Sequence, residues 1–215
     1  MVGEILVRKQ ILRKLEAFRH EKAKEIERLR AEIDGALSAK IRAQEKEFEG
    51  LTRCWEAMNK ALGQAESFVS PLQSYQDLSK MSDDFRAEYV DKLEILEAKK
   101  KEILQSEDPT SALVDAVFWM KLNRANEALR EFNNELFRFE IFLEVEIHAR
   151  FMKIMRQVRS AIVSKELSRD AGEGQFGRQA WEELTKQCKP HVDELTDRLR
   201  SRFVNRSGNL DLGAG

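Results

Sequence analysis

The residues of this sequence that could perform chemistry are three histidines, two cysteines and a glycine-rich segment. His20, His148 and His191 lie far apart in the chain, and two nearby glutamates precede His148 in Glu144-Val-Glu146-Ile-His148. A di-iron bundle needs two Glu-x-x-His pairs, and a zinc site needs a cluster of nitrogen or sulfur ligands. The sequence contains neither arrangement, so we expect ordinary surface histidines and no metal centre.

The glycine-rich segment Gly172-Glu-Gly-Gln-Phe-Gly177 matches the pattern G-x-G-x-x-G. A dinucleotide site places that pattern after a strand, inside a βαβ unit. Here a long apolar-periodic stretch typical of a helix precedes it. We therefore interpret the glycines as a helix break rather than as a cofactor site.

The two cysteines, Cys54 and Cys188, form no Cys-x-x-Cys pair and no disulfide framework, which favours a reducing compartment. Cys188 falls on an apolar stripe, so we expect a buried, inert thiol. No Ser/His/Asp or Cys/His arrangement is suggested by the spacing. The sequence therefore predicts a protein that is not an enzyme, with no catalytic residues, no cofactor and no small-molecule substrate.

The composition predicts the elements that carry these residues. Of 215 residues, only 3 are Pro and 10 are Gly, while 35% are charged. Turns normally use Pro and Gly, so few turns are available. Abundant Ala, Glu, Lys, Leu and Arg with few breakers are typical of long helices. We expect an all-α fold, an elongated antiparallel coiled-coil bundle of three to four long helices, in one domain over residues 1–206 with a flexible tail at 207–215.

The breakers divide the chain into four helical segments. The first is expected over 2–69 and ends at Ser70-Pro71, and the second over 72–105, with a bend near Ser82. Within the first segment, steps of three and four residues form a coiled-coil seam at Phe48, Leu51, Trp55, Met58, Leu62, Ala65 and Val69. The first 20 residues are expected to continue this helix, the alternative being a membrane-inserting amphipathic segment.

The third segment is expected to run from Ser111 to about 170 without interruption. Its second apolar strip, Phe137, Phe139 and Phe142, predicts burial on more than one side. The fourth segment carries Trp181, Leu184 and Cys188 on one stripe, and Pro190 should kink it.

Charge is balanced overall but unevenly placed. The formal net charge is −1, which argues against a nucleic-acid partner. Basic residues flank the turn at Pro109, and a second group lies in the third segment. Both groups suit an anionic membrane surface, where each cation contributes about 1 kcal/mol to binding. The alternative interpretation is a solvated helix face with its own ion pairs. The candidate membrane-binding residues are Lys99, Lys100, Lys101, Lys121 and Arg124 at the turn, and Arg150, Lys153, Arg156 and Arg159 beyond it.

The order of helices and several short stretches resemble a BAR domain of the kind carried by sorting nexins. Glu135-Leu-Phe-Arg-Phe-Glu140 is similar to the E-x-x-R-F-E stretch of that family, and Arg150-Phe151-Met-Lys153 to the basic run that follows it. Asn123–Phe132 resembles the helix after the tip, and Ala180-Trp181-Glu182 the Tyr-Trp-Glu of the last helix. This sequence contains no PX domain.

The resemblance implies a curved homodimer or heterodimer that binds curved anionic membranes in vesicle or endosomal trafficking, as a cytoplasmic, peripheral membrane protein. The implied dimer interface consists of Phe48, Leu51, Trp55, Met58, Phe151, Ile154, Trp181 and Leu184. The alternative function is a cytoskeletal or tethering coiled coil that binds protein partners without lipid.

Overall fold

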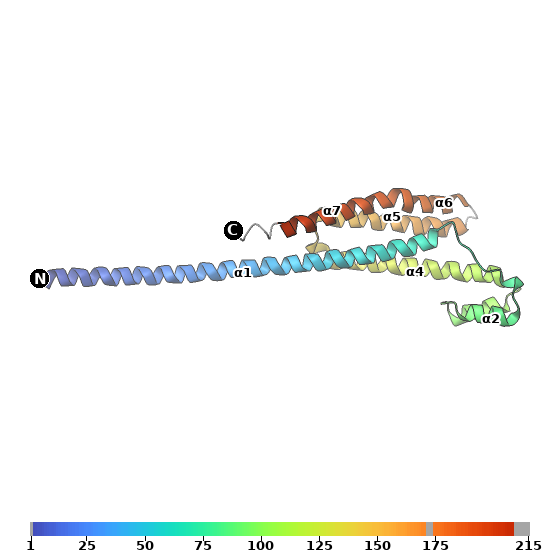
Figure 1. Cartoon of the computed structure of the whole chain (residues 1–215), viewed down its shortest axis with the longest axis horizontal. Coiled ribbons are helices and arrows are strands. Elements are labelled where there is room, and N and C mark those ends of the chain that lie inside the picture. Colours follow the sequence, from blue (N-terminus) through green and yellow to red (C-terminus); the bar gives the residue numbers. More distant parts are fainter. Residues whose placement is uncertain (1, 171–173, 209–215) are drawn as a thin grey trace. The chain divides into compact units, whose positions relative to one another are not determined.

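The structure, a computed structural model, describes the backbone of residues 2–170 and 174–208 and the side chains of residues 18–169 and 177–203. Within those ranges every regular element is a helix, and the predicted all-α class is confirmed (Figure 1). The elements are α1 (Val2–Val69), η1 (Leu78–Lys80), α2 (Asp83–Asp91), α3 (Glu97–Gln105), α4 (Pro109–Phe139), η2 (Glu140–Phe142), α5 (Val145–Asp170), α6 (Gly174–Glu182), the π-helix η3 (Glu183–Cys188) and α7 (Lys189–Gly208).

The chain divides into two compact units, residues 1–49 and 50–215. The first unit consists of the N-terminal part of α1, and every residue from 18 to 46 in it is exposed. The second unit contains the remaining helices and the hydrophobic core. A single domain over 1–206 stays a prediction. Of the tail predicted at 207–215, residues 209–215 lie outside the described residues, while α7 extends to Gly208.

The core of the second unit is built from residues 50–69 of α1, from α4 and α5, and from the stretch α6–η3–α7. Apolar residues three and four apart on each helix meet there, as expected for amphipathic helices. The rings of Phe132 on α4 and Phe151 on α5 lie 6.0 Å apart edge to face, and those of Phe68 and Phe118 lie 5.2 Å apart. The predicted break of α1 at Ser70-Pro71 is confirmed, because α1 ends at Val69.

The predicted helix over 72–105 is wrong in its continuity. Residues 72–77 are not helical, and two nine-residue helices, α2 and α3, follow η1. The bend near Ser82 is confirmed, since this residue is the N-cap of α2 with Asp83 and Asp84 in the first turn. Short helices allow this segment to fold back on the start of α4 and form a second small core of Leu78, Val90, Ile103, Leu113 and Ala116.

The predicted third helix is also two helices. After α4 ends and η2 makes one tight turn, Leu143 adopts an extended backbone and α5 begins at Val145. Neither Pro nor Gly marks this break; it is required by packing, because the reversal brings Phe151 against Phe132. The strip of phenylalanines is therefore not buried on two sides: Phe139 is buried, but Phe137 is 79% exposed and Phe142 36% exposed.

The last helical stretch begins at the predicted glycine break. α5 ends at Asp170 and α6 begins at Gly174, and residues 171–173 lie outside the described residues. Pro190 cannot donate a backbone hydrogen bond and its ring crowds the preceding turn. A π-helical turn comes directly before it, in which the Lys189 N–H donates to the Leu184 carbonyl. This wider turn accommodates the proline within a continuing helix.

Candidate functional site

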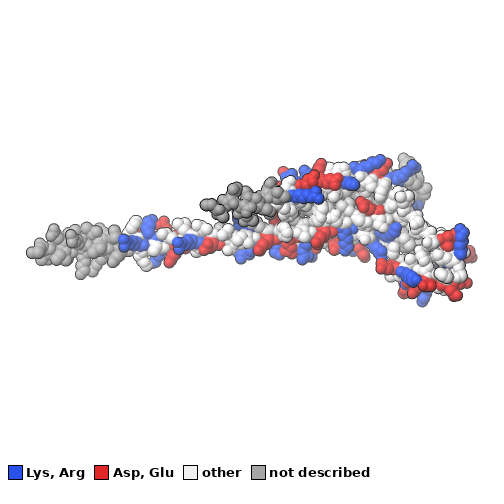
Figure 2. All heavy atoms as spheres, in the orientation of Figure 1, with Lys and Arg blue, Asp and Glu red and all other residues white. Residues whose placement is uncertain are grey.

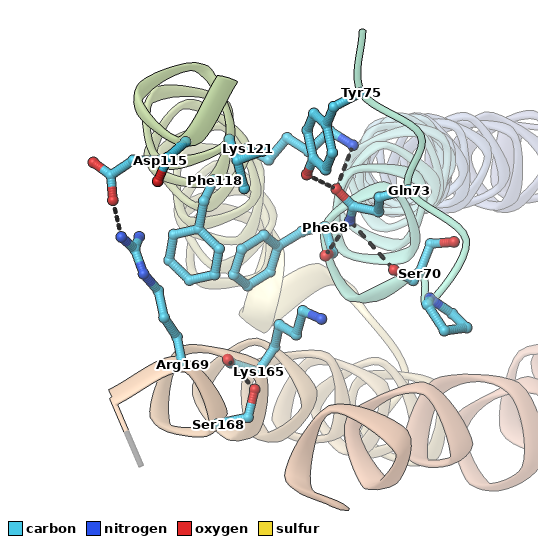
Figure 3. Close-up of a pocket in the computed structure, with 13 residues that line it drawn as sticks. Phe68, Ser70, Gln73, Tyr75, Asp115, Phe118, Lys121, Lys165, Ser168 and Arg169 are labelled. Atoms are coloured by element: carbon cyan, nitrogen blue, oxygen red, sulfur yellow. Dashed lines mark hydrogen bonds and ion pairs between the residues drawn. The ribbon is translucent and has the colours of Figure 1, made fainter. Parts of the chain in front are cut away.

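A cavity of about 410 Å³ opens in the second unit where four segments meet (Figure 3). These segments are the end of α1, the non-helical stretch that follows it, the first turns of α4 and the last turns of α5. It is lined by Phe68, Ser70, Pro71, Gln73, Tyr75, Ser111, Val114, Asp115, Phe118, Lys121, Lys165, Ser168 and Arg169. Three cations and one carboxylate among these give the lining a formal charge of +2.

Lys121 enters the cavity from α4 and is held by the segment after α1. Its Nζ donates to Gln73 Oε1 at 3.1 Å and to the Ser67 carbonyl at 3.4 Å. Gln73 is itself fixed, because its Nε2 donates to the Phe68 carbonyl at 3.0 Å and its Oε1 accepts from the Tyr75 hydroxyl at 2.5 Å. The chain after Pro71 therefore positions Lys121 in the cavity, whereas the sequence predicts this lysine at a membrane-binding tip.

Arg169 and Lys165 come from α5, one turn apart. The Arg169 guanidinium forms an ion pair with Asp115 and lies 4.3 Å from the centre of the Phe118 ring. Lys165 has no ion pair within the described part of the chain, and burial lowers its pKa. The pKa of Lys121 is lowered first by burial and then by the charge of Lys165, so the two ammonium groups repel each other.

Three of the four other cations predicted at the turn pair with nearby carboxylates. Lys99 pairs with Glu102 at 2.6 Å, and Arg124 with Glu94 at 2.6 Å. Lys100 lies 2.9 Å from Glu97 and 3.8 Å from Asp91. Figure 2 shows basic and acidic side chains intermixed in this region. Lys101 is exposed and forms no ion pair with any described residue.

The basic residues predicted on the third segment lie along α5. Arg150 pairs with Glu194 at 2.5 Å. Lys153, Arg156 and Arg159 are exposed and have no ion pair within 4.0 Å among residues 18–169 and 177–203. Farther along, on the same side of the helix as Lys153 and Arg156, Val163 is 43% exposed and Leu167 is 56% exposed. We call Lys153, Arg156, Arg159, Val163 and Leu167 the outer face of α5.

Most of the residues that the resemblance implies as a dimer interface are already buried in the core of the second unit. Leu51, Met58, Phe151, Ile154 and Leu184 are all at most 2% exposed in the core of the second unit. Trp55 and Trp181 are partly buried against the same core, and Phe48 is 56% exposed. A side chain without exposed surface cannot contact a partner, so the five buried residues stabilise the monomer instead.

The large exposed apolar residues of the chain lie elsewhere, many of them in the first unit. Ile26, Leu29, Ile33, Leu37 and Ile41 are between 47% and 63% exposed. Their spacing of three and four residues was visible in the sequence. The sequence does not indicate which apolar stripes the chain covers by itself, and for this reason the interface predicted at the strict seam after Phe48 falls largely on side chains that the core buries.

The two cysteines, which are further candidates for chemistry, are buried in the structure. Burial raises the pKa of Cys54 to about 12 and that of Cys188 to about 11, with smaller effects from Glu135 and Glu66, and both thiols are buried as predicted for Cys188. In the described part of the chain, no group of His, Cys, Asp and Glu is arranged to hold a metal ion. Of the glycine pattern, Gly174 begins α6, and Gly172 lies outside the described residues.

Comparison of the chain with protein-family models, with curated proteins and with solved structures finds no match. Among the described residues, no helix combines the length and apolar character that crossing a membrane requires.

Proposed function

We propose that this protein is a non-catalytic helical scaffold that binds anionic membrane surfaces, as its resemblance to BAR domains implies. The observation that supports the proposal is the outer face of α5, where three cations without ion pairs precede two exposed apolar side chains. The proposal moves the membrane contact from the turn at Pro109 to α5, because Lys99, Lys100 and Arg124 are already paired with carboxylates.

The outer face of α5 suits the boundary between lipid headgroups and water. Cations near an anionic leaflet gain about 1 kcal/mol each, whereas a lysine already paired with glutamate must first lose that partner. Val163 and Leu167 would add apolar contact with the upper acyl region, as in helices that lie flat on a bilayer. A dimeric, elongated BAR-like arrangement is part of the same proposal.

Sedimentation with vesicles tests this proposal. The vesicles contain phosphatidylcholine with phosphatidylserine, and binding is measured at low and high salt. Wild type should bind at low salt and dissociate at high salt, because salt screens exposed charges. Replacing Lys153, Arg156 and Arg159 by Gln should abolish binding.

The matched control replaces Lys99, Lys100 and Lys101 by Gln, which removes the same number of positive charges. This variant should keep most of its binding. If the control loses binding and the α5 variant does not, the contact lies at the turn. Absence of salt-sensitive binding by the wild type would contradict membrane binding altogether.

The exposed stripe of the first unit favours a second candidate function, a tethering coiled coil without lipid. The stripe is nearly symmetric about Ile33: Leu29 and Leu37 lie four residues to either side, Ile26 seven before and Ile41 eight after. Phe18 and Phe48 lie 15 residues to either side. Such a pattern complements itself when two copies run antiparallel, and so the partner that we propose is a second copy of this chain.

Charge also favours the antiparallel direction. Lys22 and Lys40 lie on the stripe, at helical spacing from Ile26 and Ile33. Parallel pairing would place each lysine opposite the same lysine of the second copy. Antiparallel pairing centred on Ile33 places Lys22 opposite Gln44, and brings Lys40 beside Glu25.

Disulfide trapping distinguishes these arrangements, with the native thiols contributing little because they are buried. Leu29→Cys alone should not cross-link, whereas Leu29→Cys mixed with Leu37→Cys should. Ile33→Cys should cross-link to itself. Cross-linking of Leu29→Cys to itself would indicate parallel pairing. A protein that stays monomeric in sedimentation equilibrium would contradict self-assembly, and Ile33→Asp serves as the disrupted control.

A further inference from the structure

We propose that the cavity lined by Lys121, Lys165 and Arg169 binds a phosphate group. These cations come from two helices, α4 and α5, that the reversal at 140–144 places side by side. Among the described side chains that line the cavity, Asp115 is the only carboxylate, and it already forms an ion pair with Arg169. The inference does not depend on membrane binding by α5, whose outer face uses other residues.

The arrangement leaves positive charge unbalanced in a partly buried place. Lys165 has no carboxylate partner in the described part of the chain, and the pKa of Lys121 is lowered by burial first and then by the charge of Lys165. Two ammonium groups that repel each other would be stabilised together by an anion bound in the cavity. Lysines brought together in this way are a common means of binding phosphate.

The charge of the lining matches that of a phosphate ester. Three cations and one carboxylate give +2, and a phosphate monoester carries about −1.5 to −2 at neutral pH. Ser111 and Ser168 add hydroxyl groups to the lining. Ser111 lies in the first turn of α4, whose 31 residues direct the positive end of the helix dipole to this end.

The cations are held in position by contacts that a bound anion need not break. Arg169 is stacked on Phe118 and lies 5.1 Å from the Trp119 ring centre. Lys121 is fixed by Gln73, as Figure 3 shows, and Lys165 extends from α5 toward the Phe68 side chain, which also lines the cavity. An ammonium group has three N–H donors. Lys121 already donates to Gln73 and to the Ser67 carbonyl, so the N–H groups available to an anion belong mainly to Lys165.

The cavity also has an apolar side, formed by Phe68, Val114 and Phe118. This side would contact the organic part of a phosphate ester. A lipid headgroup and a soluble phosphate monoester share the recognised chemistry, and the experiment separates these two sources.

Isothermal titration calorimetry of the full chain with inorganic phosphate tests the site. We expect saturable binding, weakened about tenfold by Lys165→Gln, since one charge-assisted contact is lost. The matched control is Lys153→Gln, which removes the same charge from the outer face of α5 and should leave phosphate binding unchanged. Circular dichroism establishes that both variants remain folded.

Vesicles then identify the source. Phosphatidic acid presents a monoester, and inorganic phosphate should compete with it if the cavity accepts a headgroup; binding to inorganic phosphate without such competition indicates a soluble ligand. Equal phosphate affinity of Lys165→Gln and wild type would overturn the inference, as would absence of phosphate binding by the wild type. The variant at Lys153, Arg156 and Arg159 should still bind phosphate, so failure of the membrane proposal is distinguishable from failure of this one.

Discussion

Two helical stretches of this chain carry similar apolar stripes with opposite outcomes. On α4, residues spaced three, four and seven apart, Leu122, Ala125, Phe132 and Leu136, are at most 3% exposed. On the first unit, Ile26, Leu29, Ile33 and Leu37 have the same kind of spacing and are at least half exposed. Helical periodicity thus indicates that a face is apolar, but does not indicate whether the chain covers that face itself.

The ion pairs of the two units also differ, in whether they join neighbouring or distant residues. In the first unit, ion pairs join neighbours on one helix, such as Lys22 with Glu25 and Arg28 with Glu32. In the second unit they also join distant segments, such as Lys60 with Glu131. Local pairs stabilise a helix by a few tenths of a kcal/mol and do not position it against anything. The proposed coiled coil would use the exposed stripe of the first unit, whereas the stripe of α4 belongs to the core of the second unit.

The largest effect expected from this comparison is at Phe132. Phe132→Ala should destabilise the second unit by about 3–5 kcal/mol, because it removes a fully buried ring and leaves a cavity beside Phe151. Urea unfolding followed by circular dichroism measures the change. Phe137→Ala, on the same helix but 79% exposed, is the matched control and should change stability by less than about 0.5 kcal/mol. Similar losses in both variants would contradict the burial pattern of α4.

The helical class, the end of α1 and the buried Cys188 could be predicted because local signals determine them: few breakers, Ser70-Pro71 and an apolar stripe. The break at 140–144 could not, since it contains neither Pro nor Gly and exists because Phe151 packs on Phe132. The cavity combines both cases. Lys121, Lys165 and Arg169 are recognisable in the sequence as basic residues, but the first two lie 44 positions apart. Only the reversal between α4 and α5 brings them together.

A smaller effect is expected from two glycines on α1. A Cβ at Gly50 would lie 2.9 Å from the Phe139 side chain, whereas one at Gly35 would have nothing within 4 Å. Gly50→Ala should therefore destabilise the second unit by about 1–3 kcal/mol through overpacking. Gly35→Ala should increase helix stability in the first unit by up to about 1 kcal/mol.

Thermal unfolding and helicity measure both glycine variants. If Gly50→Ala is as stable as wild type, α1 and α4 do not approach as closely as the structure describes. If Gly35→Ala is destabilised, the added methyl group must clash with a partner molecule, because nothing in the single chain lies near it. That result would place Gly35 in the interface of the proposed coiled coil.

The smallest effect is expected at Asp77, which connects the segment after α1 to α4. Its Oδ1 accepts hydrogen bonds from Ser79 N at 3.2 Å and from the Thr110 hydroxyl at 3.3 Å. Hydrogen bonds from Lys80 and Ser79 lower the pKa of Asp77 from 3.8 to about 2. A carboxyl with a lowered folded pKa stabilises the fold above its unfolded pKa and loses that contribution as the pH falls through the folded value.

Asp77→Asn should therefore reduce stability modestly at pH 6, while the variant and wild type should converge as the pH falls from about 4 to about 2. Hydrogen exchange of residues 78–105 across this pH range measures the difference. The first unit should exchange identically in both proteins, because Asp77 and its partners Ser79, Lys80 and Thr110 all belong to the second unit. A constant difference at every pH would mean that the geometry of the Asp77 side chain, and not its charge, stabilises the contact with Thr110.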